Sequence, residues 1–274
     1  MDIQDALEIV SQTNPGMVRS HNEDSVSFDA EIGLVVLADG MGGYNAGEVA
    51  SGIAVSVLSS EVRHRLENSR PEEVDEAGNE LAAVLLRDNV KKANLSIFHA
   101  AQSQPQYAGM GTTIVTALFY DDRVVVGHIG DSRMYRLRGE VLEGITRDHS
   151  LLQEQIDSGL ISKTDARLSK NKNLVTRAVG IDADVDPELH THEVQVGDIY
   201  LLCSDGLNDM VEDGDIEATL QMLKNNLPLA ATQLIQMAND NGGRDNVSVI
   251  LVRVKGRFAA PRGWWAKVRS WFVN

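Results

Sequence analysis

The chain has 274 residues, 43% of them hydrophobic, which is enough for one large core or two small ones. Its formal net charge of −15 argues against nucleic-acid binding, which needs a basic face, and suits a protein that concentrates divalent cations. Its single cysteine, Cys203, excludes an intramolecular disulfide and a cysteine-rich zinc site.

The N-terminus lacks the features of a secretory signal. Residues 1–10 carry three acids and no basic start followed by an apolar run. No stretch is long enough to span a bilayer. We therefore expect a cytoplasmic protein. Because no linker-like or low-complexity segment divides the chain, we expect one catalytic domain over 1–255 and a short tail over 256–274.

The first half predicts strands interrupted by two helices. Residues 33–38 form an apolar run typical of a buried strand, and a glycine-rich turn follows. A helical pattern begins at Glu48, and a second helical pattern covers about 81–97. Residues 112–138 read as three consecutive antiparallel strands, with turns at 121–122 and 130–131.

The second half begins with a polar surface excursion over about 148–175, with a short helix near its start. A strand ends at Cys203, two helices follow, the second beginning at Pro228, and the last strand covers 247–254. Antiparallel strands interrupted by pairs of helices indicate an α+β fold rather than a doubly wound parallel sheet.

Four aspartates stand at the ends of apolar strands. Asp39, Asp131 and Asp205 each follow such a run, and Asp245 precedes the last strand. Strand ends are rigid, so these side chains can converge on one point. Converging carboxylates repel one another unless cations lie between them. The pattern therefore predicts a site for several metal ions.

Oxygen-only ligands select hard cations, here magnesium or manganese. Two such ions can activate a water and hold a phosphoryl oxygen, which indicates hydrolysis of a phosphate ester. Arg19 lies next to the acids Glu23 and Asp24, and its planar guanidinium suits a phosphate.

Eight segments together resemble a known family. They cover most of the chain in the family's order: 19–25, 38–43, 111–113, 130–133, 146–150, 176–180, 204–207 and 243–248. On these motifs the chain resembles a bacterial member of the protein phosphatase 2C family, the metal-dependent (PPM) Ser/Thr phosphatases. The resemblance implies a four-layer α-β-β-α sandwich in which helix pairs flank two antiparallel sheets, and two core metal ions at one end of it.

The same resemblance implies roles for the core ligands. Asp39 would bridge the two ions, the Gly40 carbonyl would bind one of them, and Asp205 and Asp245 would hold the other. The excursion over 148–175 matches the family's flap.

The remaining implied roles surround this core. Glu23 would act mainly through metal-bound water, and Asp24 would support the cluster from behind. Asp131 would bind a weaker third ion, and Arg19 would clamp the substrate phosphate.

The proton donor to the leaving group is left open by the sequence. Animal members carry a histidine directly after the Asp-Gly pair, whereas this chain has Met41. A metal-bound water is the default donor, with His21 as the alternative. His149, in the Asp-His-Ser motif at the flap entrance, reads as a structural hydrogen-bonding residue before a catalyst.

We expect a protein-serine/threonine phosphatase that uses a metal-activated water, forms no phosphoenzyme and reverses a bacterial Ser/Thr kinase. Its partners would be phosphorylated proteins, including such a kinase or a phosphothreonine-binding protein. Two alternatives are a binding module that senses phosphoprotein or metal without turnover, and a phosphodiesterase or small-molecule phosphatase on the same metal pair.

The tail differs in composition from the rest of the chain. Five of the 25 basic residues and none of the 40 acidic ones follow Val254, and all three tryptophans lie there. As a helix after Pro261, it would place its aromatic residues on one face. It would pack on the acidic domain, bind an anionic membrane surface at the inner face of the membrane, or dock on a partner protein.

Overall fold

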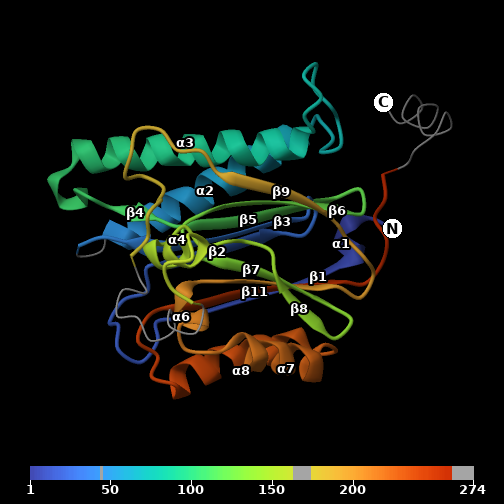
Figure 1. The fold of residues 1–274 in the computed structure, drawn as a ribbon. Helices are drawn as coiled ribbons and strands as arrows, with labels where there is room; N and C mark the ends of the chain where they lie inside the picture. The colour runs from blue at the N-terminus through green and yellow to red at the C-terminus, as the bar shows by residue number, and fades with distance from the viewer. Residues whose placement is uncertain (44–45, 163–173, 261–274) are drawn as a thin grey trace.

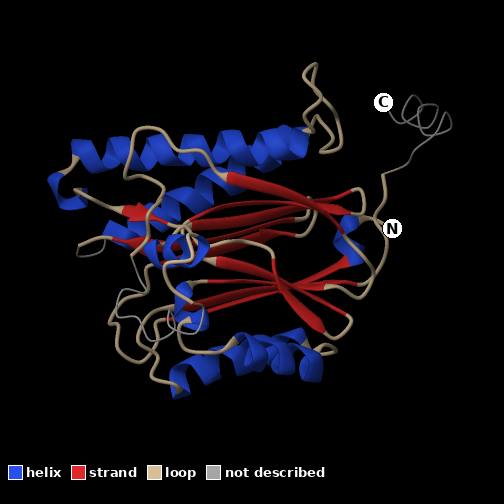
Figure 2. Cartoon of the chain, viewed as in Figure 1, coloured by secondary structure: helices blue, strands red, loops and turns tan. Residues whose placement is uncertain are grey.

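Two antiparallel sheets pack face to face between two layers of helices (Figures 1 and 2). The computed structural model describes residues 1–43, 46–162 and 174–260. The first sheet has the order β2 (Asp24–Asp29), β3 (Leu34–Met41), β5 (Ile114–Tyr120), β6 (Arg123–Ile129) and β9 (Glu188–Glu193), and β4 (Gly111–Thr112) pairs with β3. The second has the order β1 (Leu7–Asn14), β11 (Val247–Val254), β10 (Ile199–Cys203), β7 (Arg133–Arg138) and β8 (Val141–Gly144).

The helices cover the outer faces of the sheets. In Figure 1, α2 (Ala46–Leu66) and α3 (Leu81–Ser103) lie over the first sheet, and α7 (Asp213–Leu223) and α8 (Leu227–Asp240) lie under the second. Short helices complete the described fold: α1 (Ile3–Ala6), η1 (Pro105–Tyr107), α4 (Leu151–Asp157) and α6 (Asp205–Asn208). Among the residues that the structure describes, no helix is long and apolar enough to cross a bilayer.

The strand pattern explains the layers. Along β3, Val35 and Leu37 pack into the core between the sheets, whereas Val36 packs with α2 and α3. Alternate side chains of a strand point to opposite faces, so an apolar run of this kind is buried on both sides. A third cluster joins the second sheet to α7 and α8. The predicted α-β-β-α sandwich is confirmed.

One expected turn is a crossover instead. The sequence suggested that residues 130–131 join two paired strands, but β6 belongs to the first sheet and β7 pairs with β10 and β8 in the second. That interpretation was wrong because a Gly-Asp turn has the same composition whether the next strand pairs back or changes sheet. Gly130 has a φ of +103°, and a Cβ there would lie 2.7 Å from Thr113 Cβ, so the crossover requires glycine.

Strand ends from both sheets gather at one end of the sandwich. Asp24 and Asp39 are partners in the β2–β3 register, and Cys203, two residues before Asp205, pairs with Val249 of β11. In Figure 1 this end carries β4 and α6, whereas the N-terminus lies at the opposite end.

Candidate metal centre

Asp24 and Asp39 form the middle of the site. They stand opposite each other on neighbouring strands; Asp24 is buried and Asp39 is half-buried. Asp24 Oδ2 accepts a hydrogen bond from the Ser204 hydroxyl at 2.8 Å, while its Oδ1 is buried with no partner in the described part of the chain. The Asp39 carbonyl accepts from Thr113 N–H and from the Thr112 hydroxyl, each at 2.8 Å. These two hydrogen bonds hold the backbone of Asp39 in place near the end of β3.

Asp205 begins the short helix α6, directly after β10. A Cβ on the next residue, Gly206, would lie 2.0 Å from the Asn246 carbonyl oxygen, so only glycine permits this approach to the Asp245–Asn246 segment. The Asn246 amide in turn donates to the His21 carbonyl at 2.9 Å and accepts from Glu23 N–H at 2.8 Å. Asn246 thus ties the start of β11 to the loop that carries Glu23.

Gly40 and Glu23 lie against the start of α2. A Cβ on Gly40 would lie 2.1 Å from the Gly47 carbonyl oxygen, and a Cβ on Gly47 would lie 2.8 Å from the Glu23 carboxyl carbon. Two glycines therefore let the end of β3, the first turn of α2 and the Glu23 carboxylate meet. Gly40 N–H also donates to the Glu23 carbonyl at 3.1 Å.

The carboxylates disturb one another's ionisation. Burial, followed by the charges of neighbouring aspartates, raises the pKa of Asp39 and of Asp205 well above the ordinary value. Burial raises the pKa of Asp24 and of Asp131 to about 6. Burial also raises the pKa of Glu23. The site concentrates negative charge that its own residues do not neutralise.

Asp131 lies in the crossover from β6 to β7. The Ser132 hydroxyl of this crossover lies 2.7 Å from the Thr113 hydroxyl. Thr113 N–H also binds the Asp39 carbonyl, so Thr113 links the crossover to Asp39. After burial, the Asp148 charge is the next largest cause of the raised pKa of Asp131. Asp148 itself is held by Arg133 through two bonds of 2.9 and 2.7 Å.

Arg19 reaches the rim of the cluster. Its Nη2 lies 2.7 Å from Asp245 Oδ2, and about half of its side chain is exposed. The hydrogen bond to Asp245 raises the pKa of Arg19. The guanidinium therefore stands between solvent and the Asp245 carboxylate.

Asp209 joins the site although the sequence interpretation did not select it. Its charge is among the causes that raise the pKa of Asp131 and of Asp205. The available signal was its spacing, four residues after Asp205, which is one helical turn. His21, in contrast, contributes its backbone carbonyl to the site, and its side chain is exposed.

The residues present fit magnesium or manganese. The donors are carboxylate and carbonyl oxygens, which these hard cations prefer. The buried Asp24 Oδ1 without a partner and the raised pKa values both indicate a site that a cation would stabilise.

The comparisons agree with this chemistry. The family model described as protein phosphatase 2C matches residues 18–246. This chain belongs to the protein phosphatase 2C family. The serine/threonine phosphatase stp of Listeria monocytogenes is 38% identical over 256 residues, which cover 91% of this chain and 98% of that protein.

Solved phosphatase structures of this family share the fold. The Mycobacterium tuberculosis serine/threonine phosphatase PstP/Ppp aligns with a TM-score of 0.82 and 36% identity over 91% of this chain and 99% of that one. The catalytic domain of PstP in complex with two manganese ions aligns with a TM-score of 0.80 and 36% identity, over 91% and 99% of the two chains. The predicted family and enzyme class, a protein-serine/threonine phosphatase, are confirmed.

Cys203 plays no part in this site. It is fully buried in β10, and burial raises the pKa of its thiol to about 12. A thiol in this state is not a nucleophile at neutral pH.

Proposed function

We propose that this phosphatase hydrolyses phosphoserine and phosphothreonine in proteins through manganese or magnesium ions held by Asp39, the Gly40 carbonyl, Asp205 and Asp245. The observation that carries the proposal is the buried group of mutually repelling carboxylates around Asp39. Such a group is costly to the fold unless cations bind there. When bound at these residues, such ions would supply positive charge and lower the pKa of a water, which hydrolysis of a phosphate ester requires.

The surrounding residues have supporting roles in this proposal. Asp24, bonded to Ser204, keeps the Asp39 carboxylate in place, and Glu23 acts at the first turn of α2. Asp131 holds a weaker third ion at the crossover. Arg19 exchanges its contact with Asp245 for two hydrogen bonds to the substrate phosphate, a geometry that suits a guanidinium.

The leaving group receives its proton from water in this proposal. Met41 has no proton to donate, and His21 is placed by its backbone rather than its side chain. His21→Gln should therefore leave kcat nearly unchanged, both for an aryl phosphate and for a phosphothreonine peptide with a poor leaving group. A selective loss of rate on the peptide would make His21 the acid.

The division into a phosphatase domain over 1–255 and a tail over 256–274 extends this proposal. Phe258 N–H donates to Asp122 Oδ1 at 2.7 Å, and Ala260 N–H donates to Asp121 Oδ1 at 2.8 Å. The β5–β6 turn that carries these aspartates lies at the end of the strands opposite Asp131. The described chain thus ends away from the carboxylates, and the helix expected after Pro261 falls outside the described residues.

The basic, tryptophan-rich tail would act on location rather than on chemistry. We infer that it holds the enzyme at the anionic surface of the inner face of the membrane. There the enzyme would lie near substrates such as a Ser/Thr kinase or a phosphothreonine-binding protein. Deleting 263–274 should preserve aryl phosphate hydrolysis and weaken recovery with anionic vesicles. A large loss of melting temperature without any vesicle binding would favour packing on the domain, and loss of action on one phosphoprotein alone would favour partner docking.

The substrate class is tested by three assays with manganese. A phosphothreonine peptide, an aryl phosphate and a cyclic dinucleotide separate a protein phosphatase from a small-molecule phosphatase and a phosphodiesterase. We expect turnover of the peptide and the aryl phosphate. Binding of the peptide without phosphate release would identify a sensing module, and preference for the dinucleotide would contradict the proposal.

A further inference from the structure

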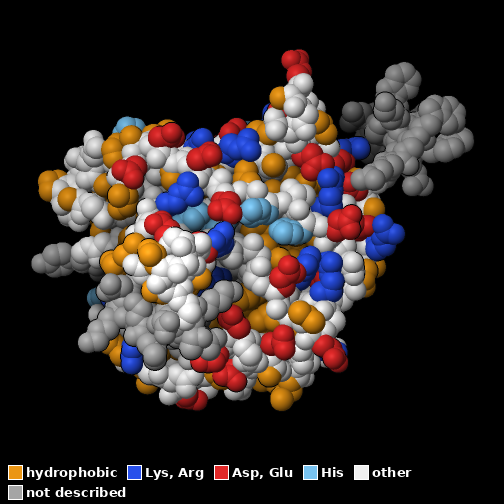
Figure 3. Space-filling view, viewed as in Figure 1, with side chains coloured by type: hydrophobic (Ala, Val, Ile, Leu, Met, Phe, Trp, Pro, Cys, Tyr) orange, Lys and Arg blue, Asp and Glu red, His pale blue; other side chains and the backbone are white. Residues whose placement is uncertain are grey.

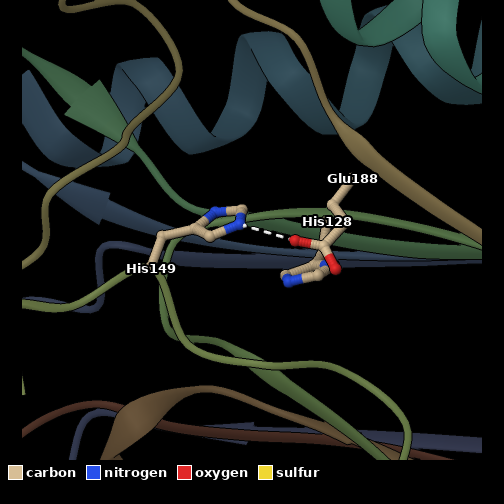
Figure 4. A group of neighbouring side chains, drawn as sticks. All are labelled: His128, His149 and Glu188. Atoms are coloured by element: carbon tan, nitrogen blue, oxygen red, sulfur yellow. Dashed lines mark hydrogen bonds and ion pairs between the residues drawn. The ribbon is translucent and has the colours of Figure 1, made fainter. Parts of the chain in front are cut away.

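A second polar cluster lies beside the crossover that carries Asp131. His128 of β6, His149 and Glu188 of β9 place one possible ligand atom each within 4.8 Å of one another (Figure 4). Two imidazoles and a carboxylate resemble the ligands of a zinc site. The hydrogen bonds decide whether these atoms are free to bind one.

The nitrogen atoms of His149 are already committed. Its Nδ1 accepts from Gly130 N–H at 3.2 Å, so the neutral ring carries its proton on Nε2, which lies 3.2 Å from Glu188 Oε2. Arg177 Nη1 lies 3.2 Å from the same Nε2, but a guanidinium has no acceptor, so this contact is not a hydrogen bond to the protonated Nε2. Burial and the Arg177 charge lower the pKa of His149. His149 therefore stays neutral, with its tautomer set by Gly130 and Glu188.

His128 does not complete a metal site either. Its Nε2 lies 2.8 Å from the Arg147 carbonyl oxygen and must carry the proton, which leaves only Nδ1 with a lone pair. The two imidazoles stack, with ring centroids 4.7 Å apart and planes 14° from parallel. Lone pairs lie in the ring planes, so those of stacked rings do not converge on one ion. The cluster is a hydrogen-bonding network rather than a metal centre.

His149 holds three segments together. Its backbone N–H donates to the Gly130 carbonyl at 2.9 Å, and its ring Nδ1 accepts from Gly130 N–H. His149 therefore binds both backbone polar groups of the residue that precedes Asp131. Its own carbonyl accepts from Thr176 N–H at 2.8 Å, at the far boundary of the predicted flap. Through Nε2 it reaches Glu188, whose Oε1 lies 2.7 Å from His190 Nε2. Figure 3 shows histidine side chains in the middle of this face, among acidic and basic groups, although His128 and His149 themselves are buried.

We propose that His149 is a positioning residue for Asp131, and that Glu188 fixes the tautomer that His149 needs for this task. The step rests on the role proposed above for Asp131. Asp131 lies on a crossover that requires the left-handed conformation of Gly130, and the bonds to His149 hold both polar groups of that glycine. Partners that orient ligand-bearing segments typically change metal affinity or activity by about 10- to 100-fold when removed.

Two matched variants separate positioning from simple packing. Asparagine places an acceptor near the Nδ1 position, whereas glutamine places its polar atoms near Nε2, and both remove the ring that stacks on His128. His149→Asn should keep kcat for an aryl phosphate within about threefold of the wild type, whereas His149→Gln should lower it about tenfold with KM unchanged. His149→Gln should also need more manganese for half-maximal rate while still binding two ions tightly by calorimetry.

A third variant covers the case in which His149→Gln does not fold. Glu188→Ala removes the acceptor for Nε2–H from a partly exposed position, and should lower kcat several-fold with little change in melting temperature. Glu193→Ala, exposed on the same strand, is its control and should retain the wild-type rate. A normal rate in Glu188→Ala would overturn the part assigned to Glu188.

Asp131→Asn distinguishes this inference from the proposed function. One outcome would overturn the inference: Asp131→Asn is slow, but His149→Asn and His149→Gln lose the same fraction of kcat, and that loss follows the decrease in their melting temperatures. His149 would then have only a structural role. If Asp131→Asn itself keeps the wild-type rate, the role of Asp131 in the proposed function fails instead.

Discussion

At the scale of single residues, Arg19, the proposed phosphate clamp, forms an ion pair with Asp245 of the carboxylate cluster. Arg19→Ala should raise KM several-fold and lower kcat/KM by roughly 10- to 100-fold, a loss of about 1.5–3 kcal/mol, because a guanidinium binds phosphate through two hydrogen bonds. Arg19→Lys should restore only part of this loss.

Steady-state kinetics with an aryl phosphate measure the effect. Arg63→Ala is a suitable control, since Arg63 forms comparable exposed ion pairs with Asp29 and Glu31 on the far half of α2. Full activity in Arg19→Ala would reduce Arg19 to a surface ion pair of the same kind.

Sequence patterns could predict the acids that stand at the end of an apolar run. Asp39 and Asp205 can be identified from the sequence for this reason. The partners of the acids were harder to predict. The bond from Ser204 to Asp24 joins residues 180 positions apart, and the bond from Glu23 N–H to Asn246 joins residues 223 apart. Such pairs depend on the three-dimensional register of strands, which a local pattern does not contain.

At the scale of elements, the junction of β3 with α2 depends on glycine. Gly40→Ala would bring Cβ to 2.1 Å from the Gly47 carbonyl oxygen, and neither backbone can yield without moving Asp39 or Glu23. We expect a loss of about 1–3 kcal/mol of stability, as for other overpacked sites, together with most of the activity.

The matched control lies in the same helix. Gly52→Ala meets no atom within 4 Å and should stabilise the protein by about 0.5–1 kcal/mol, because alanine favours the helix interior. Urea unfolding of both variants gives the comparison. Equal stability of the two would contradict the close approach of β3 and α2.

Element boundaries followed the sequence where both faces are buried. The last strand, 247–254, matches β11, which is buried along almost its whole length. β1 escaped prediction because Leu7–Asn14 mixes polar and apolar residues and is mostly half-buried. The crossover at 130–132 was not predicted because the sheet to which a strand belongs depends on the strands with which it pairs, and not on its own residues.

At the scale of the whole molecule, the carboxylates should make stability depend on metal and pH together. Burial raises the pKa of Asp24 and Asp131 to about 6, above the ordinary value of an aspartate in an unfolded chain. In metal-free protein their contribution to stability is therefore fully present below about pH 4 and is lost as pH rises through about 6.

Adding manganese should consequently raise the melting temperature more at about pH 7.5 than at about pH 5.5, because ionised carboxylates repel each other and bind cations. Thermal unfolding of dialysed protein with and without the ion measures this gain. Burial lowers the pKa of His128 and of His149 whether or not manganese is added, so their effect on stability cancels in the difference. An equal gain at the two pH values would contradict a cluster of carboxylates with raised pKa.

In the function proposed here, the carboxylates around Asp39 hold the ions that hydrolysis of a phosphorylated protein requires. Its most direct test is phosphate release from a phosphothreonine peptide at saturating manganese, for the wild type and for Asp39→Asn, Asp205→Asn and Asp215→Asn. Asp215 is exposed on α7 and serves as the control. We expect full activity in the wild type and the control, and no turnover in the other two, which should remain folded but bind manganese weakly. A near-wild-type rate in Asp39→Asn or Asp205→Asn would contradict it.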